Sequence, residues 1–537
     1  MKRMTMPPWI APCLILLAAF SSFASEDART ILDKAIKAHG GEAKLSKLKT
    51  MSSKAKGRGT NNFGAEVSFT SEISWQWPDR LKNSVTLTII KPTTFIETIS
   101  GDDGWSSCDG KPGPLGVVKR DELRTQAHVR RLLLLTPLLQ DKIYKMSVLD
   151  EIRIDDRPTV GVCVACAGER DVKLYFDAAT RLLAKVEWRV LNDSGQKEVV
   201  KEDLFSDYRE IEGVPTATQL LRRSDGKKTL ELNFTEVRYP ERLVAAEFDD
   251  PHPYTRRRDV IYGRRSGTAL TMDVFTPKKD AKGVAIVYPV SAGWVSNQSM
   301  NDLPLLSIFI DEPVKRGYTV FAVYHGSQPI FTIPEAIADV NRAVRYIRYH
   351  ACEFAIDPRR IGVMGASSGG HLALMLGVAG DGGDPRASDA VERTSSRVQA
   401  VACFFPPTDF LNFGEAGKFA FTEDGTLADF RAAIDIREFD THSKRLERIS
   451  DREKFEELCR RVSPLTHVSA VAAPALIIHG DADNLVPIQQ SEVMIAKLKE
   501  AGVPAELAVK NGRIHGWTNM DEDLRTILDW FDKHLKM

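Results

Sequence analysis

At 537 residues, the chain is too long for one ordinary hydrophobic core, so we expect two domains or three. Its 43% apolar and 27% charged residues are typical of a folded protein and exclude a disordered one. Basic and acidic residues number 73 each, so no excess of charge favours nucleic acid or an anionic membrane surface as a partner.

Residues 1–24 have the pattern of a secretory signal peptide. Lys2 and Arg3 are basic, residues 10–23 are mostly apolar, and small residues lead to a predicted cleavage after Ala24. An uncleaved N-terminal anchor is the alternative. The pattern predicts export to the periplasm or the cell exterior, where disulfides can form.

The chain contains no residue pattern that predicts a cofactor or a metal. The six cysteines after the signal peptide fit no disulfide framework and no zinc site. Cys163 and Cys166 have the spacing of a redox motif, but residues 159–167 are strand-like and offer no helix N-terminus to lower a thiol pKa. We interpret them as two strand residues. No phosphate loop or dinucleotide fingerprint occurs.

The N-terminal half alternates strands with two helical segments. Helices are predicted at residues 28–48 and 121–139. Strands are predicted at residues 66–77, 84–90, 95–99, 173–176, 183–190, 198–208, 216–222 and 229–237. Turn sequences such as Asp193-Ser-Gly195 join some of these strands as hairpins. This half is therefore predicted to be an antiparallel meander, and it shows no catalytic constellation.

Several short motifs of residues 28–251 resemble those of periplasmic lipoprotein-carrier and lipoprotein-sorting proteins. The motifs are residues 31–41 (ILDKAIKAHGG), 101–105 (GDDGW), 174–183 (LYFDAATRLL), 205–208 (FSDY) and 247–251 (EFDDP). The resemblance implies a curved antiparallel β half-barrel with helices across its open face, often around an apolar cavity. It also implies a lipid as a candidate ligand of this domain.

Residues 252–258 are predicted to form a linker, and the pattern changes after them. From residue 259 to residue 537, strands alternate with longer helical segments, which predicts βαβ units and a mainly parallel sheet. The fold class is thus an antiparallel β domain followed by an α/β domain.

A serine in the second domain has the sequence context of a nucleophile. Gly365-Ala-Ser367-Ser-Gly369 lies between a short apolar strand and a helix, which is the context that a nucleophile elbow requires. Gly365 and Gly369 leave room for a tight turn, where larger side chains would collide with the neighbouring strand and helix. The turn lifts Ser367 to the carboxyl edge of the sheet, where open α/β folds bind ligands.

A serine hydroxyl needs a histidine base and an orienting acid, which follow in the order Ser, acid, His in this arrangement. The apolar strand at residues 475–479 runs into a loop with two carboxylates, Asp481 and Asp483. Asp483 is the predicted acid because it resembles the acid in the HG-x-x-D-x-x-V-P run of many α/β-hydrolases. His515, in a glycine-flanked loop after the next helix and strand, is the predicted base.

Other residues compete for these roles or for places around them. Asp409, after the strand at residues 398–405, is the rival acid, and Asp481 is interpreted as a residue that shapes its loop. His371 is expected to pack beneath the site and His479 to form local hydrogen bonds. His325, after the strand at residues 318–324, is a candidate pocket residue.

The oxyanion that forms during acyl transfer needs two backbone N–H donors. Ser368, directly after the nucleophile, is the first predicted donor. The second is expected in the loop after the strand at residues 284–288, with Ala292 or Gly293 as candidates. Esterases commonly have H-G-G-G there, and here only Gly293-Trp294 remains of that pattern. Trp294 is a candidate pocket residue.

Residues 410–467 exceed what the core fold needs at that point. They are charged and are predicted to be mostly helical, so we expect them to form a helical cap over the pocket. Phe410, at the start of the segment, is a candidate pocket residue.

The C-terminal half is similar to α/β-hydrolases of the acetyl-esterase and feruloyl-esterase type, whose profile overlaps the prolyl-oligopeptidase catalytic domain. Residues 270–277 (LTMDVFTP), 339–347 (DVNRAVRYI) and 356–371 (IDPRRIGVMGASSGGH) carry this resemblance. It implies a serine hydrolase whose substrates are carboxylic esters, either small molecules or acyl groups on polysaccharides, and the signal-peptide pattern predicts that this hydrolase is exported. The alternatives are a prolyl-oligopeptidase-type peptidase and a lipid- or lipoprotein-binding protein with an inactive hydrolase domain. The sequence does not indicate an oligomeric state.

Overall fold

The computed structural model describes residues 26–60, 66–88, 91–101, 103–113, 115–192, 195–302, 304–448 and 451–536. The predicted signal peptide, residues 1–24, lies outside the described residues. The chain divides into two compact units, one with Asp121–Phe248 and the residues up to Asp103, the other with Gly104–Arg120 and Asp249–Met537. Among the described residues, we find no helix with both the length and the apolar character needed to cross a membrane.

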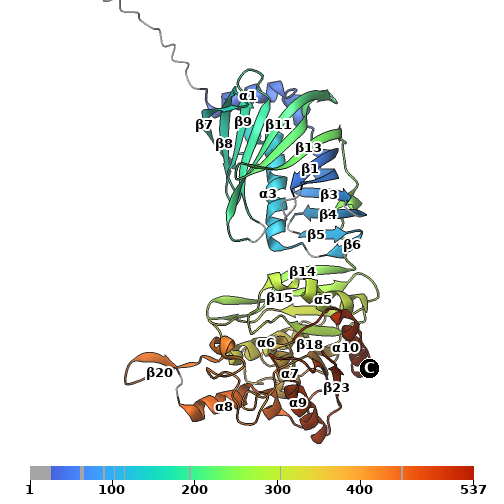
Figure 1. The fold of residues 1–537 in the computed structure, drawn as a ribbon, viewed down its shortest axis with the longest axis vertical. Helices are drawn as coiled ribbons and strands as arrows, with labels where there is room; N and C mark the ends of the chain where they lie inside the picture. The colour runs from blue at the N-terminus through green and yellow to red at the C-terminus, as the bar shows by residue number, and fades with distance from the viewer. Residues whose placement is uncertain are drawn as a thin grey trace, which may run out of the picture. The chain divides into compact units, whose positions relative to one another are not determined.

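Thirteen strands of the N-terminal half form one antiparallel sheet (Figure 1). Their order across the sheet is β6-β5-β4-β3-β2-β1-β13-β12-β11-β10-β9-β8-β7. The strands are β1 (Thr50–Thr60), β2 (Glu66–Gln76), β3 (Arg80–Thr88), β4 (Pro92–Ser100), β5 (Asp103–Cys108), β6 (Lys111–Gly113), β7 (Tyr144–Ile154), β8 (Arg157–Cys166), β9 (Val172–Asp177), β10 (Leu183–Leu191), β11 (Glu198–Ile211), β12 (Val214–Ser224) and β13 (Lys227–Arg238). The order follows the chain except where β13 pairs with β1, as expected for a meander of hairpins.

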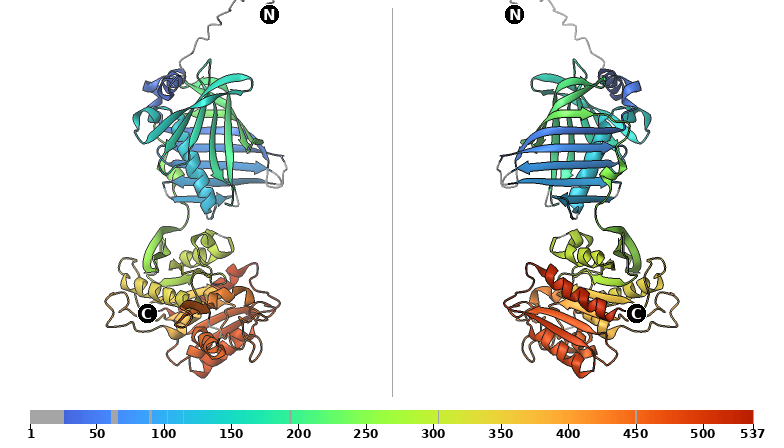
Figure 2. Two further views of the ribbon diagram at one scale, coloured as in Figure 1. Left: turned by 90° about the vertical axis from the view of Figure 1, so that its left-hand side faces the viewer. Right: turned by 90° about the vertical axis from the view of Figure 1, so that its right-hand side faces the viewer.

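Helices cover one face of this sheet. The views of Figure 2 show the sheet bending around the long helix α3 (Val117–Leu133), while α1 (Ala28–Ala38) and α2 (Glu42–Leu45) lie near one end. Leu32 of α1 and Leu132 of α3 are fully buried in one cluster with strand residues such as Phe176. The predicted helix at residues 121–139 is two helices, because Leu135 adopts φ 61° before α4 (Thr136–Gln140).

The C-terminal half contains an eight-stranded, mainly parallel sheet in the order β14-β15-β17-β16-β18-β19-β22-β23. Its strands are β14 (Tyr254–Arg265), β15 (Thr268–Pro277), β16 (Ala285–Pro289), β17 (Thr319–Val323), β18 (Ile361–Ala366), β19 (Ala400–Phe404), β22 (Ala475–Gly480) and β23 (Ala505–Lys510). β15 pairs antiparallel with β14 and with β17, and the other neighbours run parallel. β14 begins inside the predicted linker, because residues 254–257 pair with β15.

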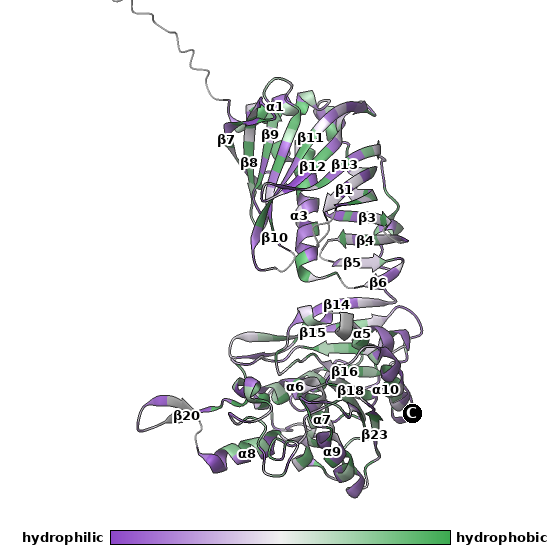
Figure 3. Cartoon of the chain, in the orientation of Figure 1, coloured by the Kyte–Doolittle hydropathy of each residue, from purple (hydrophilic) through white to green (hydrophobic). Residues whose placement is uncertain are grey.

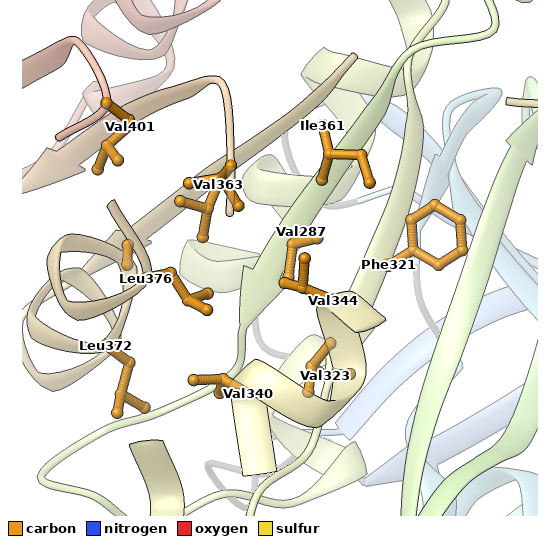
Figure 4. Close-up of a cluster of buried hydrophobic side chains, with 14 of the residues drawn as sticks. Val287, Phe321, Val323, Val340, Val344, Ile361, Val363, Leu372, Leu376 and Val401 are labelled. Carbon is orange, nitrogen blue, oxygen red and sulfur yellow. The ribbon is translucent and has the colours of Figure 1, made fainter. Parts of the chain in front are cut away.

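Helices pack on both faces of the C-terminal sheet. α6 (Ile333–Tyr349), α7 (Ser368–Ala379) and α9 (Gln489–Glu500) share one apolar cluster with it, and α5 (Pro304–Lys315) and α10 (Met520–His534) share another. Figure 4 shows the first cluster, where Val340 and Leu372 face the strand residues Val287 and Val363. Since both faces are covered, the central strands are apolar throughout, whereas β12 and β13 mix polar and apolar residues (Figure 3).

The prediction that residues 410–467 are mostly helical is wrong. The segment contains a 3-10 turn η3 (Ala428–Ile434), a hairpin of β20 (Arg437–Asp440) and β21 (Arg445–Arg448), the helix α8 (Arg452–Val462) and a 3-10 turn η4 (Pro464–His467). Of the helical elements described in this segment, α8 begins with a side-chain N-cap, since Asp451 accepts a hydrogen bond from the backbone N–H of Lys454.

Candidate active site

Ser367 lies at the turn between β18 and α7, at the carboxyl edge of the C-terminal sheet. Its backbone has φ 53° and ψ −124°, a strained conformation for a residue with a side chain. A Cβ at Gly365 would lie 2.4 Å from the carbonyl oxygen of Gly369, and one at Gly369 would lie 2.8 Å from that of Pro289. Both positions therefore require glycine, as the elbow interpretation predicts.

The structure brings Ser367, His515 and Asp483 together, although they are far apart in sequence. Nε2 of His515 lies 3.0 Å from Oγ of Ser367, and Nδ1 of His515 lies 2.7 Å from Oδ2 of Asp483. Asp483 follows β22 and His515 follows β23, so neighbouring parallel strands deliver both side chains to the same edge. In this arrangement the imidazole can accept the proton of the serine hydroxyl while the carboxylate holds its ring.

Asp483 is kept ionised by its hydrogen bonds. Burial raises the pKa of its carboxyl group, but hydrogen bonds from His479 and His515 more than offset that effect, so the pKa lies well below its ordinary value. The other oxygen, Oδ1, accepts the backbone N–H groups of Leu485 and Val486, both at 2.9 Å. The acid is thus fixed in position as well as in charge.

The rival acids bond elsewhere. Asp409 accepts the backbone N–H of Leu411 at 3.0 Å and the side-chain amide of Asn412 at 2.8 Å. Asp481 accepts the backbone N–H of Gly512 and so joins the loops after β22 and β23, as its loop-shaping interpretation predicts. Of the three carboxylates, only Asp483 is hydrogen-bonded to His515.

Two further histidines are buried near the site, and the hydrogen bonds of their imidazole rings go to residues other than Ser367. His371 accepts a hydrogen bond from the indole of Trp294 at Nδ1, 3.3 Å away, and donates from Nε2 to the carbonyl of Val462 at 2.7 Å. Nδ1 of His325 donates to the carbonyl of Gly326 at 2.8 Å. Burial lowers the pKa of both imidazoles to about 4.

The loop after β16 forms a tight turn beside the nucleophile. Ala292 and Val295 exchange both backbone hydrogen bonds at 3.0 Å, and the two residues between them, Gly293 and Trp294, have φ 55° and φ 58°. The N–H of Ala292 is therefore already used, which corrects its candidacy as an oxyanion donor. Gly293 and Ser368 remain the candidates, and both line the cavity at Ser367.

A cavity of about 360 Å³ surrounds Ser367 and His515. Its other lining residues are mostly apolar: Ser291, Ala292, Gly293, Trp294, Phe309, Ala366, Ser368, Phe405, Pro407, Leu427, Phe430, Leu485, Val486, Gly516 and Met520. Trp294 lines it as predicted. The predictions that His325 and Phe410 line the cavity are wrong, because both side chains are buried outside its lining. Phe410 packs on Trp294, with ring centroids 5.9 Å apart.

Several lining residues were absent from the sequence-based prediction. Leu427 and Phe430 belong to the segment predicted as a cap, and Met520 begins the last helix. For Leu427 and Phe430, the surplus length of residues 410–467 was the sequence feature that indicated a segment near the cavity. The side chain of Met520 gave none, because a methionine in an apolar run is an ordinary core residue.

The described part of the chain contains no group of three or more metal-ligating side chains that could hold a metal ion. The six cysteines of the described residues are all free thiols. Cys163 and Cys166 lie in β8, which accords with their interpretation as strand residues.

The BD-FAE family model matches residues 272–498. The C-terminal half of this chain carries a BD-FAE domain, an α/β-hydrolase domain. Ser367 and Asp483 lie within the matched residues, and His515 lies beyond them. The family match therefore does not cover His515, and the structure is what places His515 in the hydrogen-bonded triad.

The curated relatives that this chain matches include ester hydrolases and an acylamino-acid-releasing enzyme. The chain is 28% identical over 251 residues to LipM, a probable carboxylic ester hydrolase of Mycobacterium tuberculosis, covering 46% of this chain and 52% of LipM. It is 25% identical to the esterase LipQ of the same organism, covering 55% of this chain and 62% of LipQ. It is 26% identical to an ethyl acetate hydrolase of Pseudomonas putida, covering 55% of this chain and 86% of that protein. The chain thus spans little more than half the length of LipM and LipQ.

Solved structures similar to this chain include a truncated carbohydrate esterase from gut microbiota, at 26% identity and a TM-score of 0.42. That comparison covers 53% of this chain and 98% of the other. Another is an acetyl ester-xyloside bifunctional hydrolase from Caldicellulosiruptor lactoaceticus, at 22% identity and a TM-score of 0.40, covering 52% of this chain and 93% of the other.

Proposed function

We propose that this protein is a serine esterase that cleaves carboxylic esters through an acyl-enzyme on Ser367. The observation that carries the proposal is the hydrogen-bonded triad of Asp483, His515 and Ser367, with hydrogen bonds of 2.7 Å from His515 to Asp483 and 3.0 Å between His515 and Ser367. The names of the curated relatives support ester substrates.

The reaction follows from the geometry of the triad. His515 takes the hydroxyl proton as Oγ of Ser367 attacks the ester carbonyl, and the carboxylate of Asp483 stabilises the imidazolium that results. Negative charge develops on the carbonyl oxygen. Its assigned hydrogen-bond donors are the backbone N–H groups of Ser368 and Gly293, two residues that line the cavity. The imidazolium then protonates the leaving alcohol. Water, deprotonated by the same imidazole, releases the acid from the acyl-enzyme.

The mostly apolar cavity holds the acyl group in this proposal. We assign the natural substrate to the class of acyl esters, with acyl groups on polysaccharides as the candidate that the acetyl- and feruloyl-esterase resemblance implies. Residues 410–467 act as a cap, because Leu427 and Phe430 reach the cavity from that segment. Catalysis by this route needs no metal and no cofactor.

Export and the N-terminal domain complete the proposal. Residues 1–24 direct the chain to the periplasm or the cell exterior. The N-terminal domain is a lipoprotein-carrier-like half-barrel that can take a lipid. A cavity of about 170 Å³ between its sheet and helices supports this, since most of its lining side chains, such as Leu133, Phe205 and Phe234, are apolar.

A labelling and turnover experiment tests the proposal. The full chain should react with a fluorophosphonate probe and hydrolyse p-nitrophenyl acetate, and Ser367→Ala should do neither. Persistent labelling of Ser367→Ala would refute the nucleophile assignment. Turnover of a prolyl-peptide substrate without ester cleavage would favour the peptidase alternative. Absence of both activities in a folded wild-type chain would favour a binding protein.

A further inference from the structure

The turn that carries Gly293 is held in a conformation that its own sequence does not favour. Gly293 and Trp294 both have positive φ, and only the first is a glycine. A left-handed conformation costs a residue with a side chain roughly 1–2 kcal/mol. The turn therefore depends on contacts outside itself to keep this conformation.

Three residues supply such contacts through hydrogen bonds. The backbone N–H of Gln328 donates to the carbonyl of Trp294 at 3.2 Å, and its side-chain amide donates to the carbonyl of Gly293. The hydroxyl of Ser291 lies 2.9 Å from that of Ser368, which joins the start of the turn to the nucleophile helix. His371 makes the third contact, through the indole of Trp294.

The contact at His371 joins three parts of the site. His371 is on α7, one helical turn after Ser367, and it is fully buried. Its Nδ1 accepts the indole N–H of Trp294 from the oxyanion turn, and its Nε2 donates to the carbonyl of Val462 at the end of α8. Since both ring nitrogens are occupied, the ring has a fixed tautomer and cannot act as a second base.

Resting on the proposed function, we propose that His371 is a positioning residue for the oxyanion turn. By accepting the indole hydrogen bond, it holds Trp294 in its left-handed conformation and so keeps the N–H of Gly293 beside Ser367. His371 touches no reacting atom. Its contribution lies in the transition state, where a displaced donor lowers kcat more than it changes KM.

Two substitutions of similar size separate the two bonds of the ring. His371→Asn places a carbonyl oxygen near the position of Nδ1, so it can still accept from Trp294 but loses the bond to Val462. His371→Gln places an amide near the position of Nε2, so it keeps the bond to Val462 but loses the acceptor for Trp294. Trp294→Phe removes the donor from the other side and keeps a ring in the packed position.

The experiment compares kcat, KM and the affinity for an aryl trifluoromethyl ketone in the full chain. The ketone forms a hemiketal oxyanion on the serine and so reports on the oxyanion donors. His371→Gln and Trp294→Phe should each lose tenfold or more in kcat and in ketone affinity, with KM changed less than threefold. The double variant should be no worse than either single one, because both break the same bond.

His371→Asn should retain kcat within about threefold of wild type. Trp530→Phe is the matched control, since the indole N–H of that buried residue has no acceptor among the described residues. Melting temperatures of all variants show whether they are folded.

Wild-type kcat and ketone affinity in a folded His371→Gln would overturn the positioning role, and so would equal losses in His371→Asn and His371→Gln. Failure of the proposed function gives a different result. In that case the wild-type chain itself neither hydrolyses esters nor binds the ketone.

Discussion

His479 and Asp483 share a direct contact, with Nε2 of the histidine 3.2 Å from Oδ2 of the carboxylate. The same oxygen accepts from Nδ1 of His515. Nε2 of His479 also faces the carbonyl of Val486 at 2.9 Å, and Nδ1 lies 2.6 Å from the hydroxyl of Ser491. Because Nε2 faces two acceptors, it carries a proton and donates to the acid of the triad. Asp483 thus receives a hydrogen bond from a second histidine, His479, in addition to the one from His515.

Removing this donor should slow catalysis without removing the triad. We predict that His479→Leu lowers kcat about tenfold, because a hydrogen bond to a charged group contributes about 1.5–3 kcal/mol. His479→Gln, which can place an amide near Nε2, should recover most of the loss. Steady-state kinetics on p-nitrophenyl acetate measures both variants. Unchanged kcat in a folded His479→Leu would show that Asp483 needs no such support.

The two candidate acids differ in their contacts, and their substitutions should differ as well. Asp483→Asn should lower kcat by about ten-thousand-fold, since an amide neither stabilises the imidazolium nor enforces the tautomer of His515. Asp409→Asn should change kcat by less than threefold, because its carboxylate bonds only within its own loop. If Asp409→Asn were the more damaging change in a folded protein, the acid assignment would be reversed.

Local sequence pattern specifies the triad of this site but not every residue of its cavity wall. Ser367, Asp483 and His515 were predictable because each follows a strand whose end the fold places at one edge. The side chains of His325 and Phe410 were misplaced for a physical reason. The sequence shows that a residue is near the carboxyl edge of the sheet, but side-chain packing decides whether it lines the cavity. Trp294 lines the cavity, and Phe410 packs against Trp294 instead.

The same limit applies to longer segments. The thirteen-stranded sheet was predictable as an antiparallel meander, because hairpin pairing is local. The pairing of β13 with β1 was not, because it joins residues far apart in the chain. In residues 410–467, charged residues gave no periodicity that separates a hairpin from a helix, and the structure contains both.

The two buried imidazoles should make the catalytic domain sensitive to mild acid. His325 and His371 have folded-state pKa values of about 4, against 6.5 for an unperturbed histidine. The unfolded chain therefore binds more protons below pH 6.5. The stability that these groups contribute is fully present above pH 6.5 and is lost as the pH falls toward 4. The loss is on the order of 3 kcal/mol for each imidazole.

Urea unfolding of the full chain at pH 7.5, 6 and 5 measures this loss. In the wild type, the urea midpoint should decrease as the pH is lowered. His325→Phe should reduce the slope of the midpoint against pH. His467→Asn, at a partly exposed histidine, is the control and should leave the slope unchanged. An equal slope in wild type and His325→Phe would show that this imidazole does not contribute to the acid sensitivity.

Phe430 should limit the size of the acyl group. A Cβ built on Gly293 would lie 2.4 Å from its ring, so the ring covers the oxyanion turn and closes one side of the cavity. Phe430→Ala should raise kcat/KM for hexanoyl or aryl esters relative to acetyl esters by at least severalfold. A panel of p-nitrophenyl esters measures the ratio. Leu411→Ala, in the same segment but absent from the cavity lining, should leave it unchanged.

The inner face of the N-terminal sheet holds a buried ion pair whose loss should destabilise that domain. Nε and Nη2 of Arg222 donate to the two oxygens of Asp203 at 2.7 and 2.8 Å. Arg130 lies close by, and burial, together with the charge of Arg222, lowers its pKa to about 10. Asp203 is therefore the hydrogen-bonded counter-charge of Arg222, and its charge also acts on Arg130.

Asp203→Asn should cost about 3–5 kcal/mol of stability, because it leaves these cations buried without their counter-charge. Hydrogen exchange of β11 and β12 peptides in the full chain measures the effect where it arises. Glu231→Gln breaks the exposed pair with Lys228 and should cost less than about 1 kcal/mol. Replacing both partners, as Asp203→Leu with Arg222→Met, should recover much of the loss, since a buried pair and an apolar pair of similar volume are often equally stable. If the double replacement were as unstable as Asp203→Asn, shape rather than uncompensated charge would explain the cost.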